Sequence, residues 1–300
     1  KTRTSAVGLV LNLFSQFPYT ITKYRDDWVR IQIEKLVQEK EFDIVHIDGL
    51  HTAYYGIFLK EKFGLPIVLR AYNVETEIMR NFYRNKKKPW IKLYAYLQYK
   101  KLYKYEAAIC ELFNKCIMIT KDDEKKIKEM NARVRTCVIP AGVDTSYFYP
   151  LEIKEEPYSI VSVASMDWLP NVESILWFCR DIFPLLKKQI RQAKLYIVGK
   201  NPPVSIKRLQ GSDVVVTGFV EDVREYISRS AVFIVPLKTG SGIRVKILNA
   251  MAMARPIVST SVGCQGIDVT DGKNIYVADD AEGFAGRVVD LLSDKEKRRQ

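Results

Sequence analysis

The sequence has few of the side chains that most often bind metals or form covalent cross-links. Its 300 residues include two His and five Cys, and no two Cys stand in a Cys-x-x-Cys spacing. An odd number of scattered thiols excludes a disulfide scaffold, and so few imidazoles argue against a zinc site. We therefore expect reduced thiols and no zinc site.

Long apolar runs are also missing. No stretch approaches the roughly 20 apolar residues of a membrane-spanning helix, and the first residues show no signal-peptide pattern. The composition, 47% hydrophobic and 27% charged, excludes collagen-like and disordered chains. What the chain does have is positive charge, +12 in total, with 26 Lys and Arg against 17 Asp and Glu in residues 1–150. A basic first half favours an anionic partner.

Strand and helix patterns alternate along the whole chain. Short Val- and Ile-rich runs, each followed by a helical pattern, are typical of parallel sheets covered on both faces. The expected strands are 43–47, 66–71, 115–119, 135–139, 159–163, 194–198, 213–216, 231–235, 256–258 and 275–277. The main expected helices are 51–62, 75–113, 171–187 and 243–253. We predict two doubly wound, Rossmann-like α/β domains with ligand sites at the carboxyl ends of their strands.

A charged, proline-containing stretch, YPLEIKEEP at 149–157, indicates the connector between the domains. The predicted limits are 1–150 and 151–300. The chain opens in an apolar helical pattern and stops in a charged one. We therefore expect it to be a piece of a longer protein, with an incomplete first domain.

The most informative segment is a glycine-containing loop that leads from a strand into an amphipathic helix. Gly240 and Gly242 flank Ser241, and Arg244 and Lys246 follow within the first helical turn. Glycines let backbone N–H groups approach a ligand closely, and a helix start adds free donors and a positive dipole end. The pattern suits a diphosphate, although the same residues also occur as a plain turn and helix cap.

This segment resembles the carboxyl-terminal domain of the family 4 retaining glycosyltransferases. The resemblance continues through several blocks in the order of that family. They are FDIVH (42–46), YNVE (72–75), PAGVD (140–144), VASMDWLPNVESILWF (163–178), YIVGKNPP (196–203), VTGFVEDVREYI (216–227) and ARPIVSTSVGCQGI (254–267). It implies the two-domain GT-B fold with a cleft between the domains. It also implies transfer of a sugar from a nucleotide-sugar, with no metal, no resident cofactor and retention of anomeric configuration.

The resemblance also implies which residues bind the donor. Many members carry two glutamates eight positions apart, one at the donor sugar and one at the ribose, where this chain has Ser241 and Asn249. An amide still hydrogen-bonds ribose hydroxyls, without the carboxylate's charge. Arg244 and Lys246 are expected to neutralise the diphosphate. The other expected donor-binding residues are Ser165, Met166, Gly199, Lys200, Gly218, Gly240 and Gly242.

Candidate residues in the first half follow two of its strands. The resemblance places Asp48 where many relatives carry a histidine that contacts the donor sugar. A carboxylate there is suited to hold sugar hydroxyls or to stabilise an oxocarbenium-like transition state, so Asp48 and Ser241 are the catalytic candidates. Tyr72, Asn73 and Glu75 are proposed acceptor contacts.

A basic, aromatic stretch occupies residues 80–105, with nine Lys and Arg and no acidic residue. Tyr96, Tyr99 and Tyr103 follow a helical spacing, which suits a helix lying in an anionic lipid headgroup layer. Nucleic acid binding and a solvated helix packed on the sheet remain alternatives. The glycosyltransferase resemblance places the membrane first and nucleic acid outside the expected partners.

The predicted function is synthesis of cell-surface polysaccharide, as in a bacterial envelope, with a saccharide or lipid-linked acceptor. The enzyme is expected to be cytoplasmic and peripheral at the inner face of the plasma membrane. Two alternatives stay open at this point. One is a nucleotide-sugar 2-epimerase on the same fold, and the other is a catalytically impaired sugar-nucleotide-binding or membrane adaptor protein. The sugar, the nucleotide base and the oligomeric state are not encoded in any recognisable motif.

Overall fold

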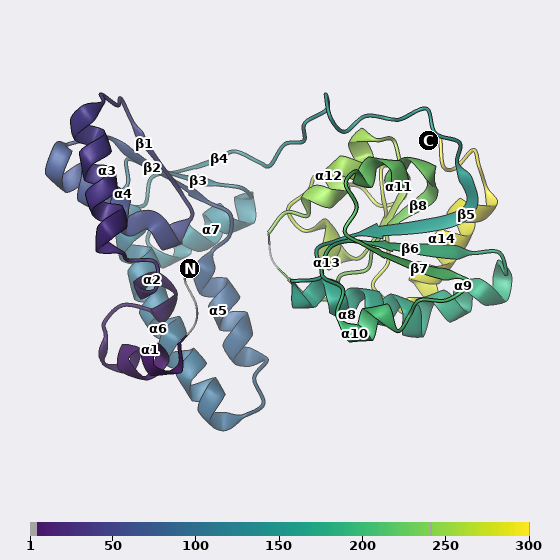
Figure 1. Ribbon diagram of the computed structural model, residues 1–300, viewed down its shortest axis with the longest axis horizontal. Coiled ribbons are helices and arrows are strands. Elements are labelled where there is room, and N and C mark those ends of the chain that lie inside the picture. The colour runs from purple at the N-terminus through teal and green to yellow at the C-terminus, as the bar shows by residue number, and fades with distance from the viewer. Residues whose placement is uncertain (1–4, 241, 300) are drawn as a thin grey trace. The chain divides into compact units, whose positions relative to one another are not determined.

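The computed structural model describes residues 5–240 and 242–299. The chain divides into two compact units, Lys1–Pro140 and Ala141–Gln300 (Figure 1). Residues 141–150, which the sequence analysis assigned to the first domain, belong to the second unit. Arg224 holds this segment, because its Nη1 donates to the Tyr147 carbonyl at 2.9 Å and its guanidinium carbon lies 3.9 Å from the Tyr147 ring centroid.

The first unit contains a parallel sheet whose strands lie in chain order, β1-β2-β3-β4. The strands are β1 (Val45–Asp48), β2 (Ile67–Ala71), β3 (Lys115–Met118) and β4 (Thr136–Val138). The helices are α1 (Ala6–Leu11), α2 (Tyr19–Thr22), α3 (Asp27–Glu39), α4 (Ala53–Phe63), α5 (Glu75–Arg84), α6 (Pro89–Glu111) and α7 (Lys121–Met130), with short 3₁₀ turns at Asn12–Phe14 and Leu50–Thr52. Its buried core includes Leu69, Phe113 and Met118.

The predicted helix over 75–113 is wrong as a single element. It is divided into α5 and α6, which pack side by side (Figure 1). Pro89 stands at the first position of α6, where its missing N–H costs nothing, whereas inside a helix it would remove a hydrogen bond. The three lysines at 86–88 form the exposed or half-buried connection between the two helices.

The second unit contains a parallel sheet in the order β10-β9-β8-β5-β6-β7. The strands are β5 (Glu156–Val163), β6 (Lys194–Val198), β7 (Val214–Gly218), β8 (Ser230–Val235), β9 (Ile257–Ser259) and β10 (Tyr276–Val277). The helices are α8 (Leu169–Trp177), α9 (Phe183–Gln189), α10 (Val204–Lys207), α11 (Val223–Arg229), α12 (Val245–Ala252), α13 (Ser261–Cys264) and α14 (Ala281–Ser293), with a π-helical turn, Phe178–Ile182, between α8 and α9.

Alternate residues of the central strands feed two cores, one on each face of this sheet. Val232 and Ile234 of β8 pack with Phe178 and helix α14, while Phe233 and Val235 pack with Ile247 of α12. A strand whose side chains are buried on both faces needs a continuous apolar run, which is the pattern found in the sequence. The predicted parallel α/β architecture of both halves is confirmed.

Candidate functional site

The candidate donor site lies where the strand order of the second unit reverses. From β5 the chain passes to β6 and β7 on one side, while β8 pairs with β5 on the other. The loops that follow β5 and β8 therefore leave the sheet from neighbouring strands at the same edge. Open α/β sheets bind ligands at such a reversal point, outside the carboxyl ends of the strands.

The glycine loop after β8 needs its glycine at position 240. Gly240 has a φ of +134°, and a Cβ there would lie 2.6 Å from Arg244 Nη2 and 2.7 Å from a ring carbon of Trp168. The backbone conformation thus favours glycine, and a Cβ would also require the Arg244 and Trp168 side chains to move. Ser241, the second catalytic candidate, lies outside the described residues.

Arg244 is the residue just before α12, and it is only 6% exposed. Its Nη1 donates to the Gly242 carbonyl at 2.6 Å, and its guanidinium carbon lies 5.4 Å from the Trp168 ring centroid. Burial lowers the pKa of Arg244, although a guanidinium stays charged at neutral pH. A nearly buried cation is therefore held against the loop at the start of a helix.

Lys246 brings a second cation to the same place. Its Nζ donates to Asn171 Oδ1 at 3.1 Å, and Asn171 Nδ2 donates to the Ser165 carbonyl at 2.7 Å. Burial, together with the positive charge of Arg244, lowers the pKa of Lys246 to about 8. Two cations that repel one another beside a helix start form a site that an anion would stabilise.

Asn171 is a residue that the sequence analysis missed. It is buried in the first turn of α8 and connects the loop after β5 to Lys246. Trp168, which contacts the glycine loop, was missed as well. The asparagine directly after Leu169-Pro170, at a helix start that follows a strand, is the signal that was available in the sequence.

The loops after β5, β6 and β7 are joined to one another by backbone hydrogen bonds. Met166 N donates to the Lys200 carbonyl at 3.1 Å, and Gly199 N donates to the Gly218 carbonyl at 3.0 Å. Lys200 Nζ lies 3.6 Å from Asp167 Oδ2, to which the Ser165 hydroxyl also donates. The structure thus gathers the predicted donor-binding residues of these loops at one sheet edge.

Asn249 lies on α12 one turn after Lys246 and is half-buried. Its backbone carbonyl accepts a hydrogen bond from Met253 N, as the end of a regular helix requires. The position shares a helix face with Lys246. Its contact with a ribose stays a prediction.

In the first unit, Asp48 and Tyr72 lie together at the ends of two paired strands, β1 and β2. A hydrogen bond with Asp48 raises the pKa of Tyr72. Asp48 is exposed and Tyr72 is 44% exposed, so both remain accessible to a ligand. Arg70, the register partner of Asp48, has its guanidinium carbon 5.4 Å from the Tyr72 ring centroid. Asn73 follows directly in the loop before α5.

Glu75 belongs to a second group of polar side chains beside this pair. His51 Nε2 lies 3.8 Å from Glu75 Oε2, and the His51 ring centroid lies 5.1 Å from that of Tyr24. Burial raises the pKa of Glu75 to about 6. Burial, with a smaller effect of Lys23, lowers the pKa of His51.

Glu106 of α6, which the sequence analysis missed, holds the start of α5. Glu106 is only 1% exposed. Its two carboxylate oxygens accept hydrogen bonds from Glu75 N at 3.0 Å and from Thr76 N at 2.8 Å. Burial raises the pKa of Glu106 to about 7, against the opposing effect of these hydrogen bonds. A carboxylate at a helix start satisfies free N–H groups and the helix dipole.

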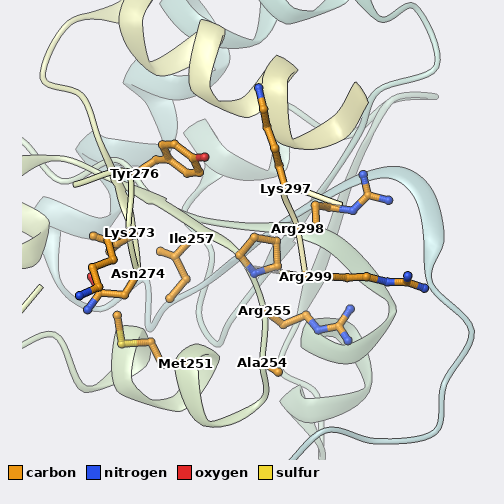
Figure 2. A pocket seen from close by; sticks show the side chains of 13 residues that line it. Met251, Ala254, Arg255, Ile257, Lys273, Asn274, Tyr276, Lys297, Arg298 and Arg299 are labelled. Atoms are coloured by element: carbon orange, nitrogen blue, oxygen red, sulfur yellow. The ribbon is translucent and has the colours of Figure 1, made fainter. Parts of the chain in front are cut away.

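A separate cavity of the second unit, shown in Figure 2, lies at the opposite edge of the sheet. Pro256 and Ile257 at the amino end of β9 line it, together with five cationic residues, Arg255, Lys273, Lys297, Arg298 and Arg299. Figure 2 shows the ends of Lys273 and Arg299 on opposite sides of this cavity. Arg255 and Arg298 both pair with Glu155, at 3.5 and 2.8 Å. Two of the five cations are therefore already paired with a carboxylate of the protein.

Two further findings concern the described residues alone. Within residues 5–240 and 242–299, no group of three or more His, Cys, Asp or Glu side chains is arranged to hold a metal ion. None of the helices in the same ranges combines the length and the apolar character needed to cross a bilayer.

Comparison with known protein families identifies the family of this chain. A model described as Glycosyltransferase Family 4 matches residues 8–147, and one described as Glycosyl transferases group 1 matches residues 157–294. These two matches take in both halves of the chain in order. The chain belongs to the group 1, family 4 glycosyltransferases, and it has the GT-B fold.

Several relatives and solved structures are similar to it. An uncharacterized 44.6 kDa protein in the cps region of Klebsiella pneumoniae is 21% identical over 271 residues, covering 87% of this chain and 68% of the relative. Sucrose-phosphate synthase from Thermosynechococcus elongatus has a TM-score of 0.70 at 17% identity, covering 93% of this chain and 70% of that one. HepE of Anabaena, solved in complex with UDP-glucose, has a TM-score of 0.67 at 12% identity, covering 90% and 74%. At these identities the solved structures establish the fold alone.

Proposed function

We propose that this glycosyltransferase moves a sugar from a nucleotide-sugar to a saccharide or lipid-linked acceptor, with retention and without a metal ion. The observation that carries the proposal is the pair of cations at the start of α12. Arg244 and Lys246 stand beside a loop that needs glycine, at the reversal point of the sheet. That combination is suited to a leaving diphosphate.

The chemistry at this edge is electrostatic. When the bond between the sugar and the diphosphate breaks, negative charge grows on the diphosphate oxygens, and fixed donors that face this charge lower the barrier. The α12 start provides free backbone N–H groups. Lys246 is already oriented by Asn171, so little reorganisation is needed when a phosphate binds. Asn249 and the loops that hold Gly199, Lys200 and Gly218 are the proposed ribose and base contacts.

In the first unit, Asp48 is the proposed contact with the reacting sugar. Its exposed carboxylate accepts the Tyr72 hydroxyl, and its remaining lone pairs are free to accept sugar hydroxyls. A negative charge at this position would also stabilise positive charge on the sugar ring in the transition state. Tyr72, Asn73 and Glu75 are the proposed acceptor contacts.

The proposed setting is the synthesis of cell-surface polysaccharide at the inner face of the plasma membrane. The relative from the cps region of Klebsiella pneumoniae supports an envelope polymer, and the Anabaena structure with UDP-glucose supports a nucleotide-sugar donor. The basic stretch 80–105 is the proposed contact with anionic lipid.

The test is turnover of the chain with a panel of UDP-, GDP-, ADP- and dTDP-sugars, with and without lipid-phosphate and oligosaccharide acceptors. We expect acceptor-dependent release of the nucleoside diphosphate, with the product's anomeric configuration retained by NMR. The change Asp48→Asn should lower turnover at least tenfold and leave nucleoside diphosphate affinity unchanged. Asp43→Asn, an exposed carboxylate just before β1, is the matched control. An isomerised free sugar nucleotide, or tight binding without any transfer, would contradict the proposal.

A further inference from the structure

An apolar groove of about 570 Å³ opens in the first unit between α1, α2, α5 and α6. Leu9, Val10 and Leu13 line one side, and Phe82, Trp90 and Ile91 line the other. The volume lies within the roughly 300–1,000 Å³ range of small-molecule sites. None of the described residues that line the groove is acidic.

The walls of the groove are held in place by polar contacts behind them. The Gln98 side chain accepts from Tyr19 N at 2.8 Å and donates to Asn12 Oδ1 at 2.9 Å. Lys101 Nζ donates to the Asn12 carbonyl at 2.6 Å and to the Leu13 carbonyl at 3.1 Å. These bonds fix the α1–α2 segment to α6, with which it lies side by side (Figure 1). The groove is therefore preformed.

Large apolar side chains of the groove remain in contact with solvent. Trp90 is 68% exposed, Val10 is 59% exposed and Phe82 is 46% exposed. The tyrosines at positions 96, 99 and 103 pack on one another and on Tyr83 of α5 at tilted or edge-on angles, and Tyr96 and Tyr103 are 39% and 37% exposed. The groove residues Trp90, Val10 and Phe82 are thus more exposed than these tyrosines.

Positive charge surrounds this apolar surface. Lys86 Nζ lies 4.3 Å from the Phe82 ring centroid, Lys88 Nζ lies 6.0 Å from that of Trp90, and Lys23 is among the lining residues. An apolar floor with a cationic rim is complementary to one kind of molecule, a hydrocarbon chain that ends in a phosphate.

We propose that this groove holds one hydrocarbon chain of a phosphate-bearing lipid, with the phosphate at Lys86 and Lys88, beside Phe82 and Trp90. This proposal depends on the proposed function in one respect, which is that the bound lipid is taken to be the sugar acceptor. The groove would hold a single lipid molecule, which differs from adsorption of the whole basic stretch to a bilayer.

The experiment measures binding of dodecyl, octyl and butyl phosphate below their micelle concentrations, by calorimetry and by Trp fluorescence, with inorganic phosphate as the reference. Affinity should rise with chain length, by about threefold to fourfold for each methylene buried. Equal affinity for inorganic phosphate and dodecyl phosphate would overturn the proposal.

The matched pair of variants is Val10→Asp and Val7→Asp. Both residues stand on α1, both are more than half exposed, α1 has no buried residue and both variants add one negative charge, but only Val10 lines the groove. Val10→Asp should weaken dodecyl phosphate binding at least tenfold, and Val7→Asp less than threefold, with unchanged circular dichroism in both. If the two variants weakened binding equally, the hydrocarbon chain would not lie in this groove.

Retention on anionic vesicles at low salt separates this proposal from the proposed function. Val10→Asp should keep vesicle binding, since the lysines are intact, and lose the chain-length dependence. If the unchanged chain bound dodecyl phosphate but not anionic vesicles, only the proposed membrane contact of residues 80–105 would be contradicted. A chain that transfers sugar but shows no preference for long alkyl phosphates would contradict the groove alone.

Discussion

The two units build their candidate sites from different materials. In the second unit the edge of the sheet is made mostly of backbone, with three loops joined by main-chain hydrogen bonds and a glycine loop at a helix start. In the first unit a main-chain bond from Gly49 N to the Arg70 carbonyl also joins two strand ends, but the candidate residues make side-chain contacts, Asp48 with Tyr72 and Glu106 with the start of α5. Main-chain contacts depend on residue type only where a glycine is required, whereas a side-chain contact is lost when its one residue changes.

The largest loss of stability should come from adding a side chain at Gly199, where two backbone segments are in contact. A Cβ there would lie 1.7 Å from the Ala164 carbonyl oxygen, and its φ is +156°. Since the obstacle is backbone, a strand end must move, and Gly199→Ala should destabilise the second unit by about 4 kcal/mol. Urea unfolding followed by hydrogen exchange of peptides from this unit measures it.

Gly142→Ala is the control for this variant, because nothing lies within 4 Å of a Cβ at that position. It should change stability by less than about 1 kcal/mol. If both variants behaved alike, the second unit's edge would be as adaptable as the first unit's, and the contrast between the units would fail.

The next effect concerns the cations that the backbone of the second unit presents. Replacing Arg244 and Lys246 together by Ala should weaken UDP, GDP or ADP binding by about 3 kcal/mol, the range for charge-assisted hydrogen bonds. Calorimetry with the three diphosphates measures it. Lys238→Ala, an exposed lysine after β8 whose Nζ lies 4.5 Å from the Trp177 ring centroid, should bind as the unchanged chain does. Undiminished affinity in the double variant would remove the proposed phosphate site.

The contrast between the units also explains what the sequence could predict. Parallel strands follow from continuous Val and Ile runs, and the glycine loop follows from neighbouring residues in one segment, so both were visible locally. The partners of Asn171 and Glu106 were not, because each acts on a residue far along the chain, Lys246 and Glu75 respectively, even though the position of Asn171 at a helix start was a local signal. Pro89 was a signal that the segment 75–113 is divided, but the helical pattern on both sides of it favoured a single helix.

The smallest effect tests the side-chain construction of the first unit through pH. The pKa of Glu106 is raised to about 7 from an ordinary value of 4.5, so folding favours the protonated carboxyl. The stability from this preference is complete below pH 4.5 and is lost as the pH rises through about 7. Because two N–H bonds also hold the carboxylate, we expect the free energy of unfolding to fall by about 2 kcal/mol between pH 5 and 8.

Glu106→Gln cannot ionise and should remove that pH dependence, while Glu61→Gln, an exposed carboxylate in the same unit, should keep it. Hydrogen exchange of α5 peptides as a function of pH measures both variants. The half-buried Glu75, with a pKa of about 6, titrates in the same direction in every variant, so the informative quantity is the difference from the unchanged chain. If the Glu106→Gln curve kept the original slope, ionisation of the buried Glu106 carboxyl would not be the source of the pH dependence, and the raised pKa assigned to this residue would be wrong.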